Sequence, residues 1–388
     1  MTPGARIAAA IEVMDDILAG NRAEKALIAW GRRSRFAGSK DRRAVRDHVY
    51  DMLRCQRSFA ALGGAYTGRG MAIGALRDAG IAPETIMTGE GHAPAPPTES
   101  ETAAIPSPAE RADLPDWLYD EFLKDWGDEA AGIAEVLRHR APVFVRVNLA
   151  RSKPDEVIAM LAADEISCAQ AANVKTALKV TDNARKIALS RAYQEGLIEL
   201  QDASSQAAVL ALPLEPNDVV LDYCAGGGGK SLAMAGLAPV QITAHDAFPQ
   251  RMRDLPARAA RAMCDIALKS REELPTSGFD LVFVDAPCSG SGTWRRDPEG
   301  KWRMTARDFA DITDIQLSVL TEARQFVRPG GHLAYATCSV LRAENDAVVA
   351  RFLQNNPDFV QSNRMQTTPG PDGDGFFLSV LQQARDAT

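Results

Sequence analysis

The stretch DVVLDYCAGGGGKSLAMAG, residues 218–236, decides how this chain folds. An apolar strand over residues 219–223 runs into four consecutive glycines, and a helical pattern follows directly. Glycines at such a turn let backbone amides approach a ligand closely, and four in a row are costly unless a ligand needs that approach. The pattern therefore predicts a strand–turn–helix unit that holds a mononucleotide-like ligand at the end of a strand.

Working outward from this turn, the chain divides into three predicted parts. From Asp218 onward strands and helices alternate, which predicts a doubly wound, Rossmann-like α/β domain over residues 206–388. A strand pattern at 142–148, a helical one at 154–166 and a short strand at 177–180 predict a small α+β segment over 141–205.

The amino-terminal residues 1–140 are predicted to form an all-α domain. Apolar residues recur at helical spacing through residues 5–80 and again near Trp117 and Phe122. Residues 82–114 are rich in proline, glycine, serine, threonine and alanine, so we interpret them as a linker or a mobile loop.

Two ligands fit the glycine turn. GGGGKS resembles the end of a phosphate-binding loop, G-x-x-x-x-G-K-[ST], and LVFVDAP (281–287) resembles the strand that accompanies it; however, Cys224 stands where the first glycine belongs. In the second reading, the strand pattern QITAHDA (241–247) ends at Asp246, 24 residues after Asp222. A carboxylate there is placed to accept both hydroxyls of a ribose, which favours a nucleoside ligand without phosphates.

Composition excludes several other classes of protein. The 388 residues are 46% hydrophobic and 24% charged, and no run approaches the roughly 18 uncharged apolar residues of a membrane helix. The first 20 residues carry Arg6, Glu12, Asp15 and Asp16, so we expect no secretory signal and a cytoplasmic location. The six cysteines form no C-x-x-C pair, which argues against structural zinc and against a disulfide framework.

Positive charge gathers in one segment of this acidic chain, whose net charge is −7. Between Arg32 and Arg57 nine basic residues face three acidic ones, a local excess of six charges. Such an excess is typical of a surface that binds nucleic-acid phosphates, although a solvated helix face explains it equally well.

Cys288 and Cys338 stand out among the cysteines because each follows a predicted strand. DLVFVDAPC (280–288) ends in Asp285 and Cys288, and HLAYATCSV (332–340), after a predicted turn RPGG (328–331), ends near Cys338. Ligands of open α/β sheets bind outside the carboxyl ends of the strands, so both thiols are expected beside the glycine turn. This shared position favours a chemical role over a structural one.

The residues just quoted resemble the Sun/RsmB-type 5-methylcytosine RNA methyltransferases. The resemblance covers roughly residues 142–388, and its most specific part is the pair DAPCSGSG (285–292) and ATCSV (336–340). FVRVN (144–148), QDASSQ (201–206), a predicted helix AENDAVVARFL (343–353) and a late strand DGFFLSVL (374–381) also match, and the helical amino-terminal region resembles a NusB-like RNA-binding domain.

This resemblance implies a fold, a cofactor and a substrate. The fold is a Rossmann-like methyltransferase domain, the cofactor is S-adenosylmethionine, and the partner is RNA, with ribosomal RNA favoured over transfer RNA by the NusB-like region. It implies neither a metal nor a membrane nor a protein partner. A nucleotide hydrolase and a non-catalytic RNA-binding scaffold are the other functions considered; Cys224 argues against the first and the two intact cysteines against the second.

The resemblance also implies residue roles. Cys338 would be the nucleophile, Cys288 would assist release of the product, and Asp285 would assist catalysis and contact the cofactor. The other predicted cofactor contacts are Cys224, Ala225, Gly226, Gly227, Gly228, Gly229, Lys230, Asp246 and Arg251. The sequence departs from the family pattern where Gly226 and Gly227 replace Ala-Pro, and where Ser270 stands in place of an acid that meets adenine.

Overall fold

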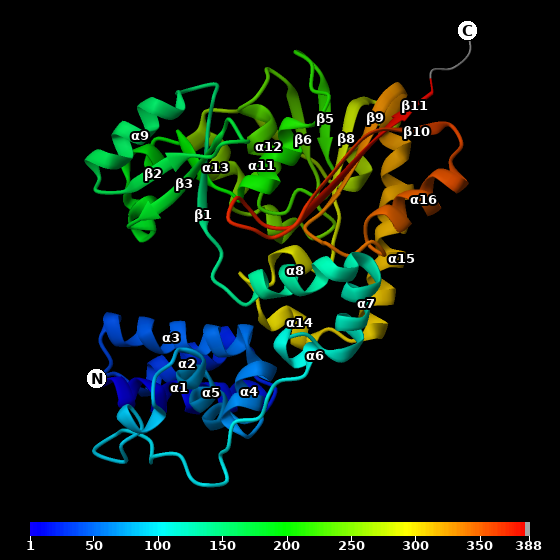
Figure 1. Cartoon of the computed structure of the whole chain (residues 1–388). Coiled ribbons are helices and arrows are strands. Elements are labelled where there is room, and N and C mark those ends of the chain that lie inside the picture. The colour runs from blue at the N-terminus through cyan, green and yellow to red at the C-terminus, as the bar shows by residue number, and fades with distance from the viewer. Residues whose placement is uncertain (385–388) are drawn as a thin grey trace. The chain divides into compact units, whose positions relative to one another are not determined.

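A computed structural model describes residues 1–384 of the chain and divides it into two compact units. One unit comprises residues 1–140 together with 294–306, and the other comprises residues 141–293 together with the described residues from 307 to 384. Figure 1 shows the first unit in blue and cyan, with a yellow segment, and the second in green through red.

The first unit is helical, as predicted for residues 5–80. Its first helix begins after Thr2, whose hydroxyl accepts a hydrogen bond from the Ala5 amide at 3.2 Å. Met14, Val45, Leu53 and Met71, on three different helices, are fully buried in one shared core. The helices are α1 (Pro3–Leu18), α2 (Ala23–Arg33), α3 (Ser39–Arg54), α4 (Gln56–Gly63), α5 (Gly68–Asp78), α6 (Pro108–Arg111), α7 (Asp116–Trp126) and α8 (Ala130–Leu137).

Residues 82–114 form an irregular segment that is anchored at several points. Apart from one turn of 3-10 helix (Pro83–Thr85) and α6, they form turns and extended chain. The Arg69 guanidinium binds the Glu101 carboxylate at 2.6 Å and the carbonyls of Ala95 and Pro96 at 3.0 Å. These contacts hold the loop against α5 within one unit, whereas the sequence alone suggested a linker or a mobile loop.

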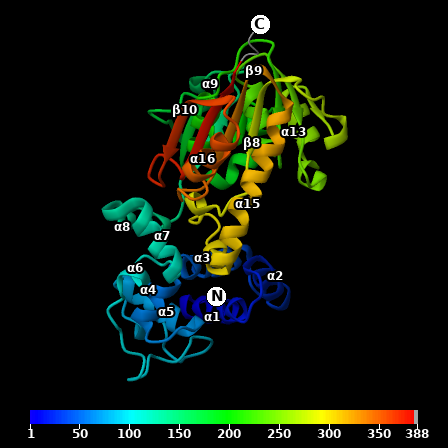
Figure 2. The same cartoon turned by 90° about the vertical axis from the view of Figure 1, so that its right-hand side faces the viewer.

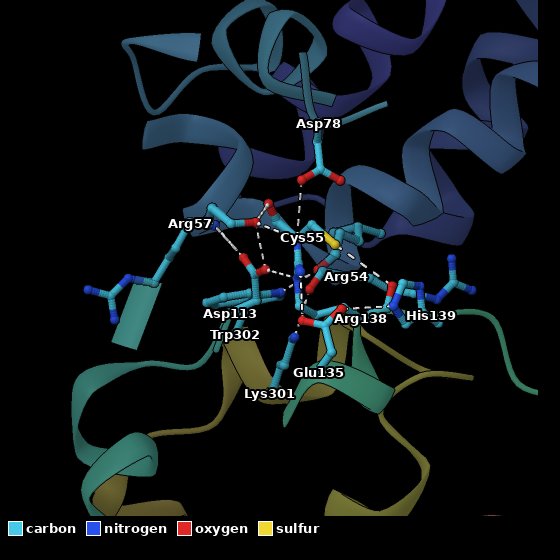
Figure 3. A network of polar contacts seen from close by, with 12 residues as sticks. Arg54, Cys55, Arg57, Asp78, Asp113, Glu135, Arg138, His139, Lys301 and Trp302 are labelled. Carbon is cyan, nitrogen blue, oxygen red and sulfur yellow. Dashed lines mark hydrogen bonds and ion pairs between the residues drawn. The ribbon is translucent and has the colours of Figure 1, made fainter. Parts of the chain in front are cut away.

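Residues 294–306 lie in sequence between two segments of the α/β unit, but they pack in the helical unit. They contain α14 (Glu299–Arg303), and Figure 3 shows how Lys301 and Trp302 reach the end of α3. The Lys301 ammonium donates to the Arg54 carbonyl at 2.9 Å, and the Trp302 ring nitrogen donates to the Leu53 carbonyl at 2.6 Å. In return, Arg54 donates to the carbonyl of Arg295 at 2.8 Å. The prediction had placed this whole segment in the domain of residues 206–388.

Lys301 is expected to make the stability of the protein depend on pH. Its side chain is 1% exposed, and burial lowers its pKa from 10.5 to about 8. Between pH 8 and 10.5 the unfolded chain therefore binds more protons than the folded one, so folding becomes more favourable as pH rises. Relative to Lys301→Met, the parent protein should gain roughly 3 kcal/mol of unfolding free energy over this range.

Urea unfolding of both proteins at several pH values measures this effect. The methionine variant keeps the apolar stem without the titrating group, so the difference between the two curves isolates Lys301. A difference that stays constant from pH 7 to pH 10.5 would show that the ammonium is not desolvated.

The second unit contains a small antiparallel sheet of order β2-β3-β1-β4. Its strands are β1 (Val143–Val147), β2 (Ser167–Gln170), β3 (Ala177–Asp182) and β4 (Ile198–Leu200), with α9 (Pro154–Ala163) and α10 (Arg191–Gln194) between them. The predicted helix over 154–166 ends earlier than expected because Glu165 adopts a positive φ and the chain turns into β2. This sheet and the large sheet belong to the same compact unit.

The large sheet has seven strands in the order β10-β11-β9-β8-β5-β6-β7. The five strands from β9 to β7 are parallel, while β11 and β10 add an antiparallel edge. This confirms the predicted doubly wound, Rossmann-like fold. The strands are β5 (Val219–Asp222), β6 (Gln241–Ala244), β7 (Ile266–Leu268), β8 (Phe279–Asp285), β9 (Val327–Thr337), β10 (Phe359–Thr367) and β11 (Phe376–Gln383).

Helices cover both faces of this sheet. α11 (Ala203–Leu210), α12 (Gly229–Ala235) and α13 (Leu255–Ala262) share one apolar core with one face. α15 (Ala306–Ala323) and α16 (Asp346–Asn355) share a second core with the other face, and Figure 2 shows these two helices in front of the strands. The double covering explains why the central strands are almost wholly apolar.

Two local predictions on this sheet were wrong. The RPGG stretch at 328–331 is no separate turn but lies within β9, where Gly330 has a φ of +76° and the pairing with β8 shifts register. The helix predicted over 343–353 begins at Asp346, so Glu344 lies in the turn before it. The turn prediction was wrong in type because pairing with β8 keeps residues 328–331 within β9, whereas the helix prediction was wrong only in where the helix begins.

Candidate active site

The glycine turn joins β5 to α12 in a shape that requires glycine at two positions. Gly226 and Gly228 have φ values of +52° and +76°, in the left-handed region that side chains disfavour. A Cβ on Gly228 would lie 2.1 Å from a Leu255 methyl carbon. Backbone conformation therefore requires glycine at both positions. At Gly228 the packing of α13 against the turn adds a second requirement.

Asp246 secures the turn from the neighbouring strand. It lies two residues beyond the end of β6, is 2% exposed, and accepts hydrogen bonds from the amides of Gly226 and Phe248, both at 2.9 Å. The exposed Arg251 guanidinium lies 3.2 Å from the same carboxylate. The structure thus brings Asp246 and Arg251 to the glycine turn, as the sequence predicted.

The small sheet supports the turn from another side. Arg146 of β1 is buried and donates to the Gly229 carbonyl at 2.7 Å and to the Gln201 side chain at 2.5 Å. Burial lowers the pKa of Arg146 to about 10, which leaves the guanidinium charged at neutral pH. Arg146 of FVRVN and Gln201 of QDASSQ therefore both contact the glycine turn. The sequence pattern did not predict this role for either residue.

Asp222 at the end of β5 is a candidate site residue that no sequence motif singles out. One carboxylate oxygen accepts from the Ser231 hydroxyl at 2.5 Å, while the other is buried without a hydrogen-bond partner among residues 1–384. Burial raises the pKa of Asp222 to about 7. An unsatisfied buried acceptor is costly, so its persistence beside a ligand-binding turn points to a ligand donor.

The two cysteines meet at the ends of β8 and β9. Their sulfur atoms lie 3.3 Å apart, although the residues are 50 positions apart in sequence. Asp285, the last residue of β8, accepts a hydrogen bond from the Lys230 ammonium at 2.6 Å. Because Lys230 belongs to the helix that follows the glycine turn, this ion pair connects the turn to the cysteine pair.

Charges around the pair make the two thiols unequal. The hydrogen bond with Cys288 lowers the pKa of Cys338, and the Lys230 ammonium lowers it further, against the opposing effects of burial and of the Asp285 carboxylate. The same hydrogen bond and burial raise the pKa of Cys288, and the Glu344 carboxylate adds to this. Cys338 is therefore the thiol that ionises first, and the thiolate is the nucleophilic form.

Other predicted site residues lie around the turn with less specific contacts. Burial raises the pKa of Cys224, whose side chain packs against the apolar core, so only its backbone is suited to a ligand contact. Ala225 accepts the Gly228 amide at 2.8 Å and donates its own amide to His245 at 2.9 Å. Gly227 is exposed, and Ser270 follows β7 and begins a short 3-10 helix.

In the helical unit, six of the nine basic residues from Arg32 to Arg57 form two groups. Arg54 is buried in contacts with Asp51 and Arg295, and Arg57 pairs with Asp116 at 2.6 Å. Four exposed arginines instead line a groove of about 760 Å³ between α2 and α3, which we call the arginine groove. Its lining residues are Glu24, Leu27, Ile28, Trp30, Gly31, Arg32, Arg35, Arg42, Arg46 and Tyr50.

Two features are absent from residues 1–384, the part of the chain that the structure describes. No cluster of three or more His, Cys, Asp or Glu side chains there is arranged to hold a metal ion. Within the same range, no helix has the length and apolar character needed to cross a membrane.

Two family models match the chain, one within the second unit and one that begins in the first unit and ends in the second. The family described as 16S rRNA methyltransferase RsmB/F matches residues 209–382, and the ferredoxin-like domain of RsmF/B-like methyltransferases matches residues 114–186. A solved methyltransferase homologue from Pyrococcus horikoshii is 25% identical, with a TM-score of 0.62 over 71% of this chain and 97% of that one.

Two ribosomal RNA small subunit methyltransferase B proteins are similar over most of the chain. The protein from Sodalis glossinidius is 31% identical over 297 residues, which cover 72% of this chain and 68% of that protein. The protein from Xanthomonas campestris pv. campestris is 32% identical over 302 residues, covering 72% and 69%. The chain thus spans about two thirds of the length of these relatives.

Proposed function

This chain belongs to the RsmB/F family of 16S rRNA methyltransferases, and on that premise we propose that it methylates carbon 5 of a cytosine in ribosomal RNA. S-adenosylmethionine is the cofactor of this family of RNA methyltransferases. The observation that carries the finer proposal is the contact of two thiols at 3.3 Å beside the Lys230–Asp285 ion pair. A methyltransferase acting on a nucleophilic nitrogen or oxygen would need no such thiols.

The residues around the glycine turn fit this cofactor. When bound, S-adenosylmethionine supplies an electrophilic methyl group on a sulfonium. The free oxygen of Asp222 can accept from its ammonium, and Asp246, with Arg251 beside it, is placed for the ribose hydroxyls. The positive-φ glycines leave room for close backbone approach.

The cysteine pair explains how a poorly nucleophilic carbon is activated. In our proposal the Cys338 thiolate forms a bond to carbon 6, and the ring π electrons move to carbon 5, which becomes nucleophilic. The bound cofactor would supply the methyl group for carbon 5, and its sulfur would leave with the electron pair of the broken methyl–sulfur bond. Asp285 holds Lys230 beside Cys338 and is placed to hydrogen-bond the cytosine ring. A base next removes the carbon-5 proton, the ring double bond re-forms, and the Cys338 sulfur leaves with its bonding pair; Cys288 assists this elimination.

Asp246→Ala tests the cofactor site. Loss of its bonds to the Gly226 and Phe248 amides and to the ribose should weaken S-adenosylmethionine binding by about 1–3 kcal/mol. Calorimetric titration measures this, with ATP as the second ligand, because a phosphate-binding loop would favour ATP. Unchanged affinity in the variant would remove Asp246 from the site.

The arginine groove is proposed to contact RNA phosphates. Arg32 and Arg35 have no ion-pair partner within residues 1–384, and Arg46 lies over the Tyr50 ring at 5.7 Å. Four guanidinium groups against one carboxylate, Glu24, give the groove a net positive charge that suits a polyanion.

Replacing Arg32, Arg35 and Arg46 with alanine should reduce the salt dependence of RNA binding. Each lost contact to a single-strand phosphate should lower the slope of log affinity against log salt by about 0.7. Arg33→Ala is the control. Arg33 lies next to Arg32 on α2, but it pairs with Glu12 and does not line the groove. Equal slopes for the triple variant and the control would show that the groove is solvated surface.

Bisulfite sequencing of total RNA tests the function as a whole. RNA from a strain lacking this gene should lose one methylated cytosine in small-subunit ribosomal RNA, and expression of the parent protein should restore it. Loss of a transfer RNA signal instead would assign the alternative substrate, and no loss at any cytosine would overturn the proposed carbon-5 chemistry.

A further inference from the structure

We infer that Glu344 is a positioning residue that fixes the loops carrying Cys288 and Cys338 against each other. This inference rests on the proposed roles of the two cysteines. Glu344 lies in the turn between β9 and α16 and is 0% exposed, so it cannot itself contact RNA. Its carboxylate lies between the two loops and binds a residue that adjoins each cysteine.

The contacts of the carboxylate reach both loops. One oxygen accepts from the Ser289 amide at 2.7 Å, and the other accepts from the Ser289 hydroxyl and from the Ser339 hydroxyl. Ser289 follows Cys288 directly, and Ser339 follows Cys338 directly. A single side chain therefore connects the residues next to both thiols.

Gln316 of α15 extends this connection to the other side of Cys288. Its side-chain amide donates to Glu344 at 3.1 Å and to the Pro287 carbonyl at 2.9 Å. Pro287 and Ser289 flank Cys288 in sequence, so the backbone on both sides of that thiol is tied to the same carboxylate. Such supporting contacts are what hold reacting groups in a productive geometry.

The hydrogen-bond pattern favours an ionised carboxylate. All four partners of Glu344 are donors, and the two serine hydroxyls already accept from the amides of Ser291 at 3.2 Å and Leu341 at 3.1 Å. An amide or a protonated acid would place a donor against these donors. Burial raises the pKa of Glu344, while the bonds from Ser289 and Ser339 oppose that rise.

A purely structural role would not explain this arrangement. Burying a carboxylate carries a desolvation cost, and apolar residues of similar size often serve stability as well or better. The carboxylate also lies close enough to Cys288 to raise the pKa of that thiol, so its charge favours ionisation of Cys338 instead. Glu344 therefore contributes both to the distance between the thiols and to the difference between them.

The rate at which diamide oxidises Cys288 and Cys338 to a disulfide measures the positioning without any RNA. Diamide takes two electrons and two protons from the thiols, and peptide mapping by mass identifies the linked pair. In the parent protein this reaction should be fast because the sulfur atoms are already 3.3 Å apart. The double variant Ser289→Ala/Ser339→Ala removes both hydroxyl tethers but leaves the charge, and its cross-linking should be slower by about tenfold or more.

Glu344→Gln extends the test to activity. Its kcat for methyl transfer should fall while the KM for S-adenosylmethionine stays within about twofold, since no cofactor-site residue is altered. Removing the charge alone would favour the Cys288 thiolate and speed cross-linking, so slower cross-linking in this variant also reports lost positioning. Asp346→Asn is the matched control, because that nearby carboxylate binds the Arg364 guanidinium on the surface, and it should behave like the parent.

Parental cross-linking rates in the double serine variant would overturn the inference, provided that the variant melts cooperatively. If Glu344→Gln fails to fold, the serine variants decide the matter by themselves. A failure of the cytosine proposal would appear separately, as absence of carbon-5 methylation by the parent protein, and would leave the cross-linking result unchanged.

Discussion

Cys338→Ala is expected to abolish methyl transfer and to leave no covalent complex with RNA. Cys338 is the thiol whose pKa is lowered, chiefly by the hydrogen bond with Cys288, while Lys230 offsets part of the opposing effect of Asp285. Cys338 therefore supplies the thiolate that adds to carbon 6 in our proposal. Without that addition carbon 5 is never activated, and no later step can occur.

Cys288→Ala should behave in the opposite way and accumulate a covalent protein–RNA complex. Addition and methyl transfer need only Cys338, whereas elimination is the step assigned to Cys288. Removing a late step while sparing the early one makes the covalent intermediate accumulate, and the complex should survive a denaturing gel.

Both variants are compared on one gel, with cofactor and substrate RNA present. Cys168→Ala serves as the control, since Cys168 is a half-buried free thiol on β2 of the small sheet. An adduct found only in Cys338→Ala would reverse the assignment of the two cysteines. An adduct in neither variant would remove the support for separate roles.

Lys230→Met is expected to lower kcat by about 10²–10³-fold, the range found when a preorganised electrostatic contact in an active site is removed. Burial acts to lower the pKa of Lys230, but Asp285 at 2.6 Å raises it above its ordinary value, so the ammonium stays charged. That charge stabilises the Cys338 thiolate. Its loss leaves Asp285 unpaired beside the thiol.

The pH dependence of kcat separates this effect from a loss of folding. Removing Lys230 raises the pKa of Cys338, so the thiolate fraction at a given pH falls and half-maximal rate should move to higher pH. Lys230→Arg keeps the charge and should retain a profile close to that of the parent. A methionine variant with an unshifted profile would show that Lys230 does not influence the thiol.

Local sequence alone determined the central fold and located the candidate site residues at strand ends. The strand–glycine–helix pattern of 218–236 specifies a βα unit because glycine is the residue that adopts positive φ without strain, as Gly226 and Gly228 do. Alternating strand and helix periods then specify a parallel sheet. The end of a strand can be located in the sequence, because the apolar strand pattern stops there. Four candidate residues could therefore be placed at strand ends: Asp246, Asp285, Cys288 and Cys338.

Segment boundaries could be predicted only approximately, because the tertiary contacts that set them are not local. The local sequence predicts Gly330 to lie in a turn. Pairing with β8 instead keeps it inside β9, where the register of the pairing shifts. The local sequence predicts Arg54 and Arg57 to belong to a basic surface patch. In the structure Arg54 binds the Arg295 carbonyl and Arg57 pairs with Asp116. The local sequence predicts residues 294–306 to belong to the α/β domain. In the structure Lys301 and Trp302 bind the end of α3.

Only the tertiary structure decided how the site residues meet. The 3.3 Å contact between Cys288 and Cys338 exists because β8 and β9 are neighbours in the sheet, and the order of strands does not appear in the spacing of residues along the chain. The Lys230–Asp285 pair and the contact between Glu344 and Ser289 likewise each join residues 55 positions apart in sequence. A sequence pattern reports local geometry, whereas burial, charge pairing and thiol ionisation depend on neighbours that folding alone brings together.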